Sequence, residues 1–172
     1  MIILFTGLSG SGKTTLSDLL KERLEKSSYS VHQIDGDIFR KEEKSKNRFT
    51  RKEILANNSQ IISYCQSVEK NYDFVILSVI FPYQEMRDRA RETFKNNYFE
   101  IFLDCPLGVL IKRDPKKFYA KALAGKIKNP IGLSPESPYE LPKRCDLKIN
   151  TNQDDINSSL NKIWTQLKIK QS

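Results

Sequence analysis

The sequence predicts an α/β fold of the P-loop NTPase type, a single domain whose parallel β-sheet is flanked by helices on both faces. Three observations lead to this prediction. Short apolar runs alternate with amphipathic stretches along the chain, which is the pattern of β–α–β units. The first apolar run passes directly into a glycine-rich segment that opens a helical stretch. The length of 172 residues is that of one ordinary domain, so we take residues 1–172 as a single domain.

Strands are expected where apolar residues run continuously over a short distance. The run at 74–80 is unbroken, which is typical of a central strand in a parallel sheet. The expected strands are 2–6, 31–35, 74–80, 99–103 and 147–149.

Helices are expected where apolar residues recur at helical spacing, as the leucines at 16, 19, 20 and 24 do. Thr50 with Glu53 three residues later predicts a capping box at a helix start. Residues 125–142 contain four prolines and two glycines, so we expect a loop there. The expected helices are 13–26, 50–69, 83–96, 106–112, 116–123 and 154–168.

Composition and charge exclude several classes of protein. No apolar run approaches the ~20 residues of a membrane span. The net charge is +8, but the 29 basic residues are dispersed without a long tract, so we expect no nucleic-acid partner. Three widely spaced cysteines fit free thiols in a reducing cytoplasm.

The segment from Gly7 to Thr14 matches the phosphate-binding pattern G-x-x-x-x-G-K-[ST]. Glycines let the backbone curl so that several N–H groups point at phosphate oxygens, and the following helix adds its positive N-terminal end. Lys13 would reach the β- and γ-phosphates of ATP, and the Thr14 hydroxyl would bind Mg²⁺. The predicted nucleotide-binding residues are Gly7, Ser9, Gly10, Ser11, Gly12, Lys13, Thr14 and Thr15.

A phosphate loop alone leaves several functions open. A regulatory GTPase would carry an Asn-Lys-x-Asp sequence after a later strand, and the chain has none. A nucleic-acid-binding ATPase would show a clustered basic stripe, which is also missing. A small kinase is therefore the favoured function.

Asp35 and Asp37 follow the second expected strand. Ligands of open parallel sheets sit beyond the carboxyl ends of the strands, so both carboxylates should face the phosphate loop. One could accept the proton of an attacking hydroxyl while the other, most simply Asp35, orients Mg²⁺. Arg40 lies three residues after Asp37 and suits an anionic acceptor.

Arg113 and Lys116 follow the fourth expected strand. Kinases need cations that close over the transferring phosphoryl group, so we expect a mobile lid around residues 113–142 that supplies them.

Together these motifs resemble the adenylylsulfate kinase family over nearly the whole chain. The matching segments are 6–15, 35–37 with Arg40, Phe49 with Asn57, 80–91, 104–107, 113–116, 119–122, 124–128, Gly132 and 137–140. The resemblance implies phosphorylation of a nucleotide ribose 3′-hydroxyl by MgATP, with Asp37 as base or Mg²⁺ organiser. It places Arg40, Phe49, Asn57, Ile80, Phe81 and Lys128 on the acceptor side, and it leaves a homodimer open.

Departures from the family pattern lie mainly on the acceptor side. Three family arginines are absent, at Ile54, Ser59 and Gln60. Phe81 replaces a serine that could carry phosphate, and Pro130 replaces an aromatic residue of the adenine clamp. A related enzyme, cytidine diphosphoramidate kinase, acts on a smaller base with a different terminal group. The sequence therefore predicts cytidine diphosphoramidate as the acceptor, with adenylylsulfate as the alternative.

Overall fold

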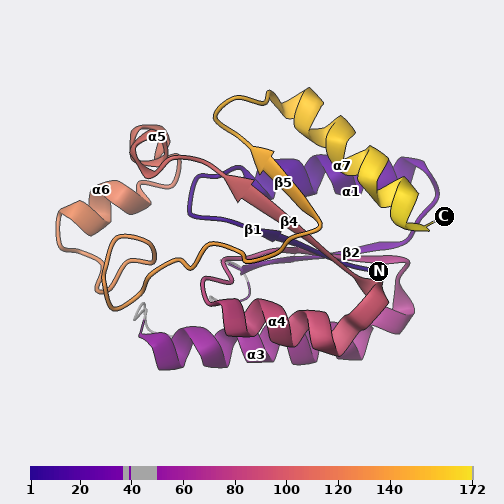
Figure 1. The fold of residues 1–172 in the computed structure, drawn as a ribbon, viewed down its shortest axis with the longest axis horizontal. Helices are drawn as coiled ribbons and strands as arrows, with labels where there is room; N and C mark the ends of the chain where they lie inside the picture. Colours follow the sequence, from indigo (N-terminus) through magenta and orange to yellow (C-terminus); the bar gives the residue numbers. More distant parts are fainter. Residues whose placement is uncertain (37–38, 40–49, 172) are drawn as a thin grey trace.

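The computed structural model describes residues 1–36, 39 and 50–171. It forms one α/β domain built on a five-stranded parallel sheet, as predicted (Figure 1). The strands are β1 (Ile2–Thr6), β2 (Val31–Asp35), β3 (Phe74–Ser78), β4 (Tyr98–Asp104) and β5 (Leu147–Asn150). Their order across the sheet is β2-β3-β1-β4-β5, and every pair is parallel. The carboxyl ends of all five strands therefore meet at one edge.

Helices cover both faces of the sheet. One face packs against α1 (Lys13–Lys26) and α7 (Ile156–Gln171), and the other against α3 (Arg51–Val68) and α4 (Gln84–Phe94). Two short helices, α5 (Leu107–Arg113) and α6 (Phe118–Leu123), lie beyond the end of β4. Among the described residues, no helix combines the length and apolar character needed to cross a membrane.

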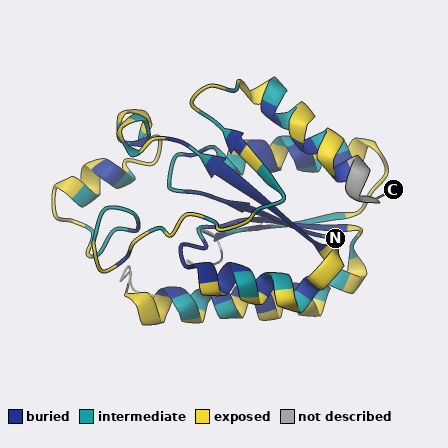
Figure 2. Cartoon of the chain, in the orientation of Figure 1, coloured by how far each residue is buried: buried dark blue, intermediate teal, exposed yellow. Residues whose placement is uncertain are grey.

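Alternation along β1 divides the core into two layers. Ile2 and Leu4 belong to the cluster that faces α3 and α4, whereas Ile3 and Phe5 belong to the cluster that faces α1 and α7. All four side chains are fully buried, and Figure 2 shows the same burial along the central strands. Burial on both faces explains why the strand sequences read as unbroken apolar runs.

Several expected boundaries were wrong by one or two residues, for local reasons. β3 ends at Ser78 rather than Ile80, because its outer neighbour β2 ends at Asp35, which is paired with Ser78. α7 begins after Asp155, whose carboxylate accepts a hydrogen bond from the Ser158 N–H at 2.8 Å and so caps the helix. The chain at the end of the expected helix 83–96 instead closes with a 3₁₀ turn at Lys95–Asn97.

The predicted capping box at the start of α3 is confirmed. Thr50 Oγ1 accepts a hydrogen bond from the Glu53 N–H at 3.3 Å, and Glu53 Oε2 accepts one from the Thr50 N–H at 3.2 Å. Two N–H groups that have no partner within the helix are thereby satisfied.

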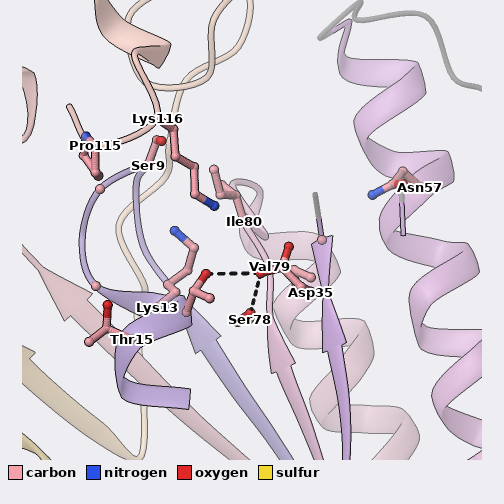
Figure 3. Close-up of a pocket in the computed structure, with 14 residues that line it drawn as sticks. Ser9, Lys13, Thr15, Asp35, Asn57, Ser78, Val79, Ile80, Pro115 and Lys116 are labelled. Atoms are coloured by element: carbon pink, nitrogen blue, oxygen red, sulfur yellow. Dashed lines mark hydrogen bonds between the residues drawn. The ribbon is translucent and has the colours of Figure 1, made fainter. Parts of the chain in front are cut away.

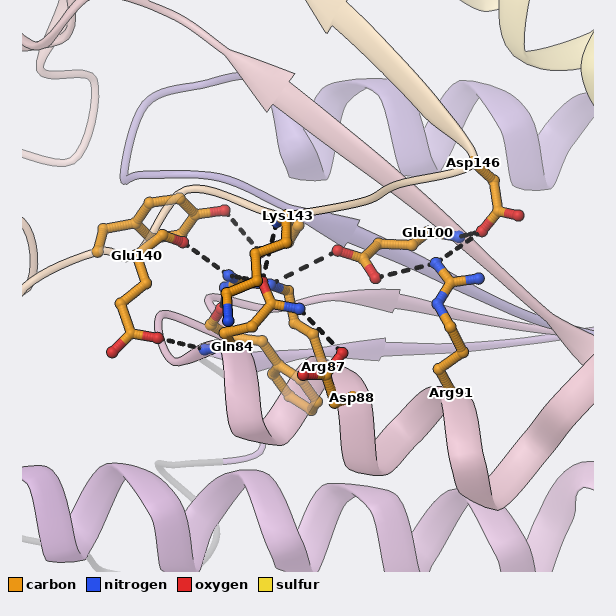
Figure 4. Close-up of polar contacts among 11 residues, drawn as sticks. Gln84, Arg87, Asp88, Arg91, Glu100, Glu140, Lys143 and Asp146 are labelled. Atoms are coloured by element: carbon orange, nitrogen blue, oxygen red, sulfur yellow. Dashed lines mark hydrogen bonds and ion pairs between the residues drawn. The ribbon is translucent and has the colours of Figure 1, made fainter.

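A buried polar network ties the chain after residue 139 to α4 and β4 (Figure 4). The Arg87 guanidinium is completely buried and donates to the carbonyl oxygens of Phe81 and Glu140, the latter at 2.7 Å. Its Nε lies 3.6 Å from the Glu100 carboxylate, which also pairs with Arg91 at 3.2 Å. Burial raises the pKa of the Glu100 carboxyl, while the two arginines oppose that shift.

Replacement of Thr50 by alanine should lower the free energy of unfolding by about 1 kcal/mol, because one N–H group at the start of α3 loses its partner. Urea unfolding followed by circular dichroism would measure this change. Thr50→Ser keeps the hydroxyl and should behave like the wild type. Equal losses in the alanine and serine variants would contradict the capping role.

Candidate functional site

The glycine-rich segment leaves β1 and enters α1, at the edge where the strands end. Gly7 has a φ of 149°, and a Cβ built on it would lie 2.7 Å from the Leu103 carbonyl oxygen. Only glycine fits this close approach between the loop and β4. Gly10 also has a positive φ, of 75°. The loop therefore has the tight curl that the motif predicts.

The Lys13 side chain folds across the loop it belongs to. Its Nζ donates hydrogen bonds to the carbonyl oxygens of Gly7 at 2.9 Å and Leu8 at 2.8 Å. The ammonium group is thus held at the mouth of the loop, where a bound phosphate would meet it.

The Asp35 carboxylate joins three elements at the floor of the site. Its Oδ2 accepts hydrogen bonds from Thr14 Oγ1 at 3.1 Å and from Ser78 Oγ at 3.2 Å. A hydroxyl and a carboxylate this close are suitable oxygen ligands for Mg²⁺, which usually takes one or two protein ligands and completes its shell with water and phosphate. Within the described chain, no group of three or more His, Cys, Asp or Glu side chains could hold a metal ion.

These side chains line a cavity of about 150 Å³ at the ends of β1, β2 and β3 (Figure 3). The amino groups of Lys13 and Lys116 are both directed into it. Asn57 of α3 forms part of the wall, with its amide nitrogen directed toward the cavity. The lining residues are Ser9, Gly10, Gly12, Lys13, Thr14, Thr15, Asp35, Gly36, Asn57, Ser78, Val79, Ile80, Pro115 and Lys116.

Arg113 lies elsewhere than expected. Its guanidinium donates to the Thr151 carbonyl oxygen at 2.8 Å and lies 3.6 Å from Cys105 Sγ. It lines a second cavity of about 710 Å³ on the other side of the phosphate loop, which Ser11 also borders. The expected pairing of Arg113 with Lys116 over one phosphoryl group is therefore not seen.

The sequence analysis missed the outer wall of this second cavity. It is formed by the turn between β5 and α7, including Thr151, Asp154 and Ser158. The only signal was position, because this turn follows the carboxyl end of the last expected strand.

Two expected acceptor residues lie away from the first cavity. The Phe81 side chain is fully buried in the core cluster that faces α3 and α4, and Lys128 is exposed and lines neither cavity. Ile80, in contrast, lines the first cavity as expected. The remaining expected residues, Asp37, Arg40 and Phe49, lie outside the described residues.

Comparison with known proteins gives a consistent picture. Residues 1–150 match the model of the family described as adenylylsulphate kinase. The adenylyl-sulfate kinase of Rippkaea orientalis is 35% identical over 165 residues, covering 96% of this chain and 90% of that protein. The structure of the Mycobacterium tuberculosis APS kinase in complex with AMPPNP and APS superposes with a TM-score of 0.86 at 29% identity, covering 97% and 96% of the two chains. Shikimate kinase from Aquifex aeolicus, at 18% identity and a TM-score of 0.57, with 98% of this chain and 96% of that chain covered, shares the fold.

Replacement of Gly7 by alanine should lower the free energy of unfolding by more than about 1 kcal/mol, because the new Cβ would collide with backbone at a φ that alanine avoids. Gly108→Ala in α5 is the matched control, since a Cβ there meets nothing within 4 Å. That variant should be neutral or more stable by up to about 1 kcal/mol. Urea unfolding of both variants tests the difference, and equal stabilities would contradict the close approach described above.

Proposed function

The chain belongs to the adenylylsulfate kinase family, and from this premise we propose that it transfers the γ-phosphate of ATP to the ribose 3′-hydroxyl of adenylylsulfate. The observation that carries the proposal is the first cavity, in which a phosphate-binding wall faces a wall for a second nucleotide. Lys13, Thr14 and Asp35 provide the groups that a nucleoside triphosphate with Mg²⁺ requires. Asn57 lies on the opposite wall, where a second nucleotide would bind.

In the proposed mechanism, the phosphate loop binds the phosphates of ATP through its N–H groups and through Lys13. Lys13 leaves the Gly7 and Leu8 carbonyl oxygens and contacts the β- and γ-phosphates. Thr14 and Asp35 would hold Mg²⁺, which when bound neutralises phosphate charge. Lys116, in the same cavity, is the residue we assign to stabilising charge on the transferring phosphoryl group.

A base must accept the proton of the 3′-hydroxyl. We assign this role to Asp37, which follows the strand that ends at Asp35. Asp35 is already engaged with Thr14 and Ser78, which suits it to the ion rather than to the proton. For the adenosine of ATP we propose the second cavity, where Arg113 offers a planar cation suited to stacking on a base.

The cytidine nucleotide that the sequence predicts is supported less well than adenylylsulfate, because the relatives reported above are named adenylylsulfate kinases. One observation still favours it as a second candidate. Ile54 stands where the family has an arginine, and it packs with Tyr83 and Ile131 in a closed apolar cluster. The arginine at the start of the same helix, Arg51, pairs with Glu85 at the surface. An acceptor with a smaller base and a different terminal anion would depend less on the arginine that Ile54 replaces and on the aromatic residue that Pro130 replaces.

Lys13→Ala should reduce kcat by at least about 100-fold, because the developing charge on the phosphoryl group loses a preorganised cation. An assay that couples ADP release to NADH oxidation would measure the loss. Lys26→Ala, an exposed lysine at the end of the same helix, is the matched control and should keep wild-type turnover. Near-normal turnover in the Lys13 variant would remove the loop from the mechanism.

The acceptor can be identified by side-by-side kinetics with adenylylsulfate and cytidine diphosphoramidate at saturating MgATP. We expect kcat/KM for adenylylsulfate to exceed that for the cytidine nucleotide by at least about tenfold, which is the scale of one hydrogen bond to a charged group. The reverse ratio would establish the second candidate. Absence of turnover with either nucleotide would contradict both.

A further inference from the structure

We propose that Tyr119 is a positioning residue that sets the orientation of the Ser9–Gly10 peptide in the phosphate loop. Its side chain is fully buried, and its hydroxyl donates a hydrogen bond to the Ser9 carbonyl oxygen at 3.0 Å. The two residues are 110 positions apart, so this bond connects α6 directly to the loop. The inference rests on the proposed binding of ATP at this loop.

The effect on nucleotide binding follows from the geometry of the peptide group. A trans peptide is planar, and its C=O and N–H point in opposite directions. A hydrogen bond that holds the Ser9 carbonyl toward Tyr119 therefore turns the Gly10 N–H the other way. Gly10 lines the first cavity, where phosphate would bind. Tyr119 thus orients an N–H donor that it never contacts.

The Ser9–Gly10 peptide needs a hydrogen bond to hold its orientation because the loop is rich in glycine. Gly10 has a φ of 75°, and glycine moves between positive and negative φ at little cost. Without a partner for the Ser9 carbonyl, this peptide could rotate and present its oxygen to the phosphates instead. An oxygen there would repel the anion that the N–H attracts.

Tyr119 is itself held in place. The Asp114 carboxylate accepts hydrogen bonds from the N–H groups of Tyr119 at 3.0 Å and Ala120 at 2.8 Å, which fixes the first turn of α6. The Phe118 ring meets the Tyr119 ring edge-on at 5.2 Å. Burial raises the pKa of the Tyr119 hydroxyl, so the group remains a protonated donor.

Other contacts between residues 113–142 and the loop are of a different kind. A Cβ on Gly132 would lie 2.4 Å from Leu8 Cδ2, so the chain there packs tightly on the loop. The Tyr139 hydroxyl is hydrogen-bonded to the Thr6 side chain at 2.9 Å. These contacts brace side chains, whereas Tyr119 bonds a peptide carbonyl next to the phosphate position.

The test is Tyr119→Phe, which removes one oxygen and keeps the buried ring. Isothermal titration calorimetry with MgADP and MgATP should show Kd values raised about tenfold, the scale of one weakened bond to a charged phosphate. The KM of the acceptor should stay within about twofold of wild type, since its binding wall is untouched. Tyr98→Phe is the matched control. Tyr98, the first residue of β4, is equally buried but lies beside Arg91 of α4, away from the phosphate loop.

Thermal unfolding of both variants separates a structural role from a positioning role. A lower Tm for Tyr119→Phe with wild-type nucleotide Kd would overturn the inference, as would an equal loss of affinity in Tyr98→Phe. Asp114→Asn keeps the Tyr119 hydroxyl but loosens the first turn of α6. It should also weaken nucleotide binding, by a smaller factor than Tyr119→Phe. Unchanged affinity in both the Asp114 and Tyr119 variants refutes the inference alone. Wild-type protein that binds no MgATP would instead refute the proposed function.

Discussion

The parallel pairing of β1 with β3 on one side and β4 on the other is the constraint on which the site depends. Because the three strands run the same way, the chain leaves all of them at one edge. The phosphate loop leaves β1, the segment from Ser78 to Ile80 leaves β3, and the turn into α5 leaves β4. Asp35 arrives at the same edge from β2. Residues spread over a hundred positions of sequence, such as Ser9 and Tyr119, are therefore brought within hydrogen-bonding distance.

The two sides of the cavity are organised differently. On the nucleotide side, Lys13 spans the carbonyl oxygens of the loop, and Tyr119 and Gly132 contact the loop from later in the chain. A site arranged before the ligand arrives loses less conformational entropy on binding. On the other side, Asn57 and Ile80 supply the wall. Differences between relatives in what they phosphorylate would be expected to arise on that side.

Local signals in the sequence were enough for most of the fold. The capping box at Thr50 and the curl at Gly7 depend on neighbours within a few residues, and both were predictable. The hydrogen bond from Tyr119 to Ser9 was not, because nothing in either segment specifies a partner 110 residues away. The position of Arg113 beside the second cavity was not predictable, since spacing alone does not say which side of the loop α5 will flank. Arg87 gave no sign of burial, because an arginine on an amphipathic helix ordinarily lies in solvent.

The buried pair of Arg87 and Glu100 limits the order in which substitutions at these two positions can be tolerated. Glu100 has a second cation nearby in Arg91, so a neutral residue at position 87 would leave the carboxylate still paired. Loss of Glu100 first would leave the buried Arg87 guanidinium with its neutral acceptors but without a compensating negative charge, at a cost of about 3–5 kcal/mol. That is a large share of the roughly 5–15 kcal/mol that holds a domain together. Mutational routes away from this pair therefore have a preferred order: position 87 changes at lower cost before position 100, and the opposite order passes through a less stable chain.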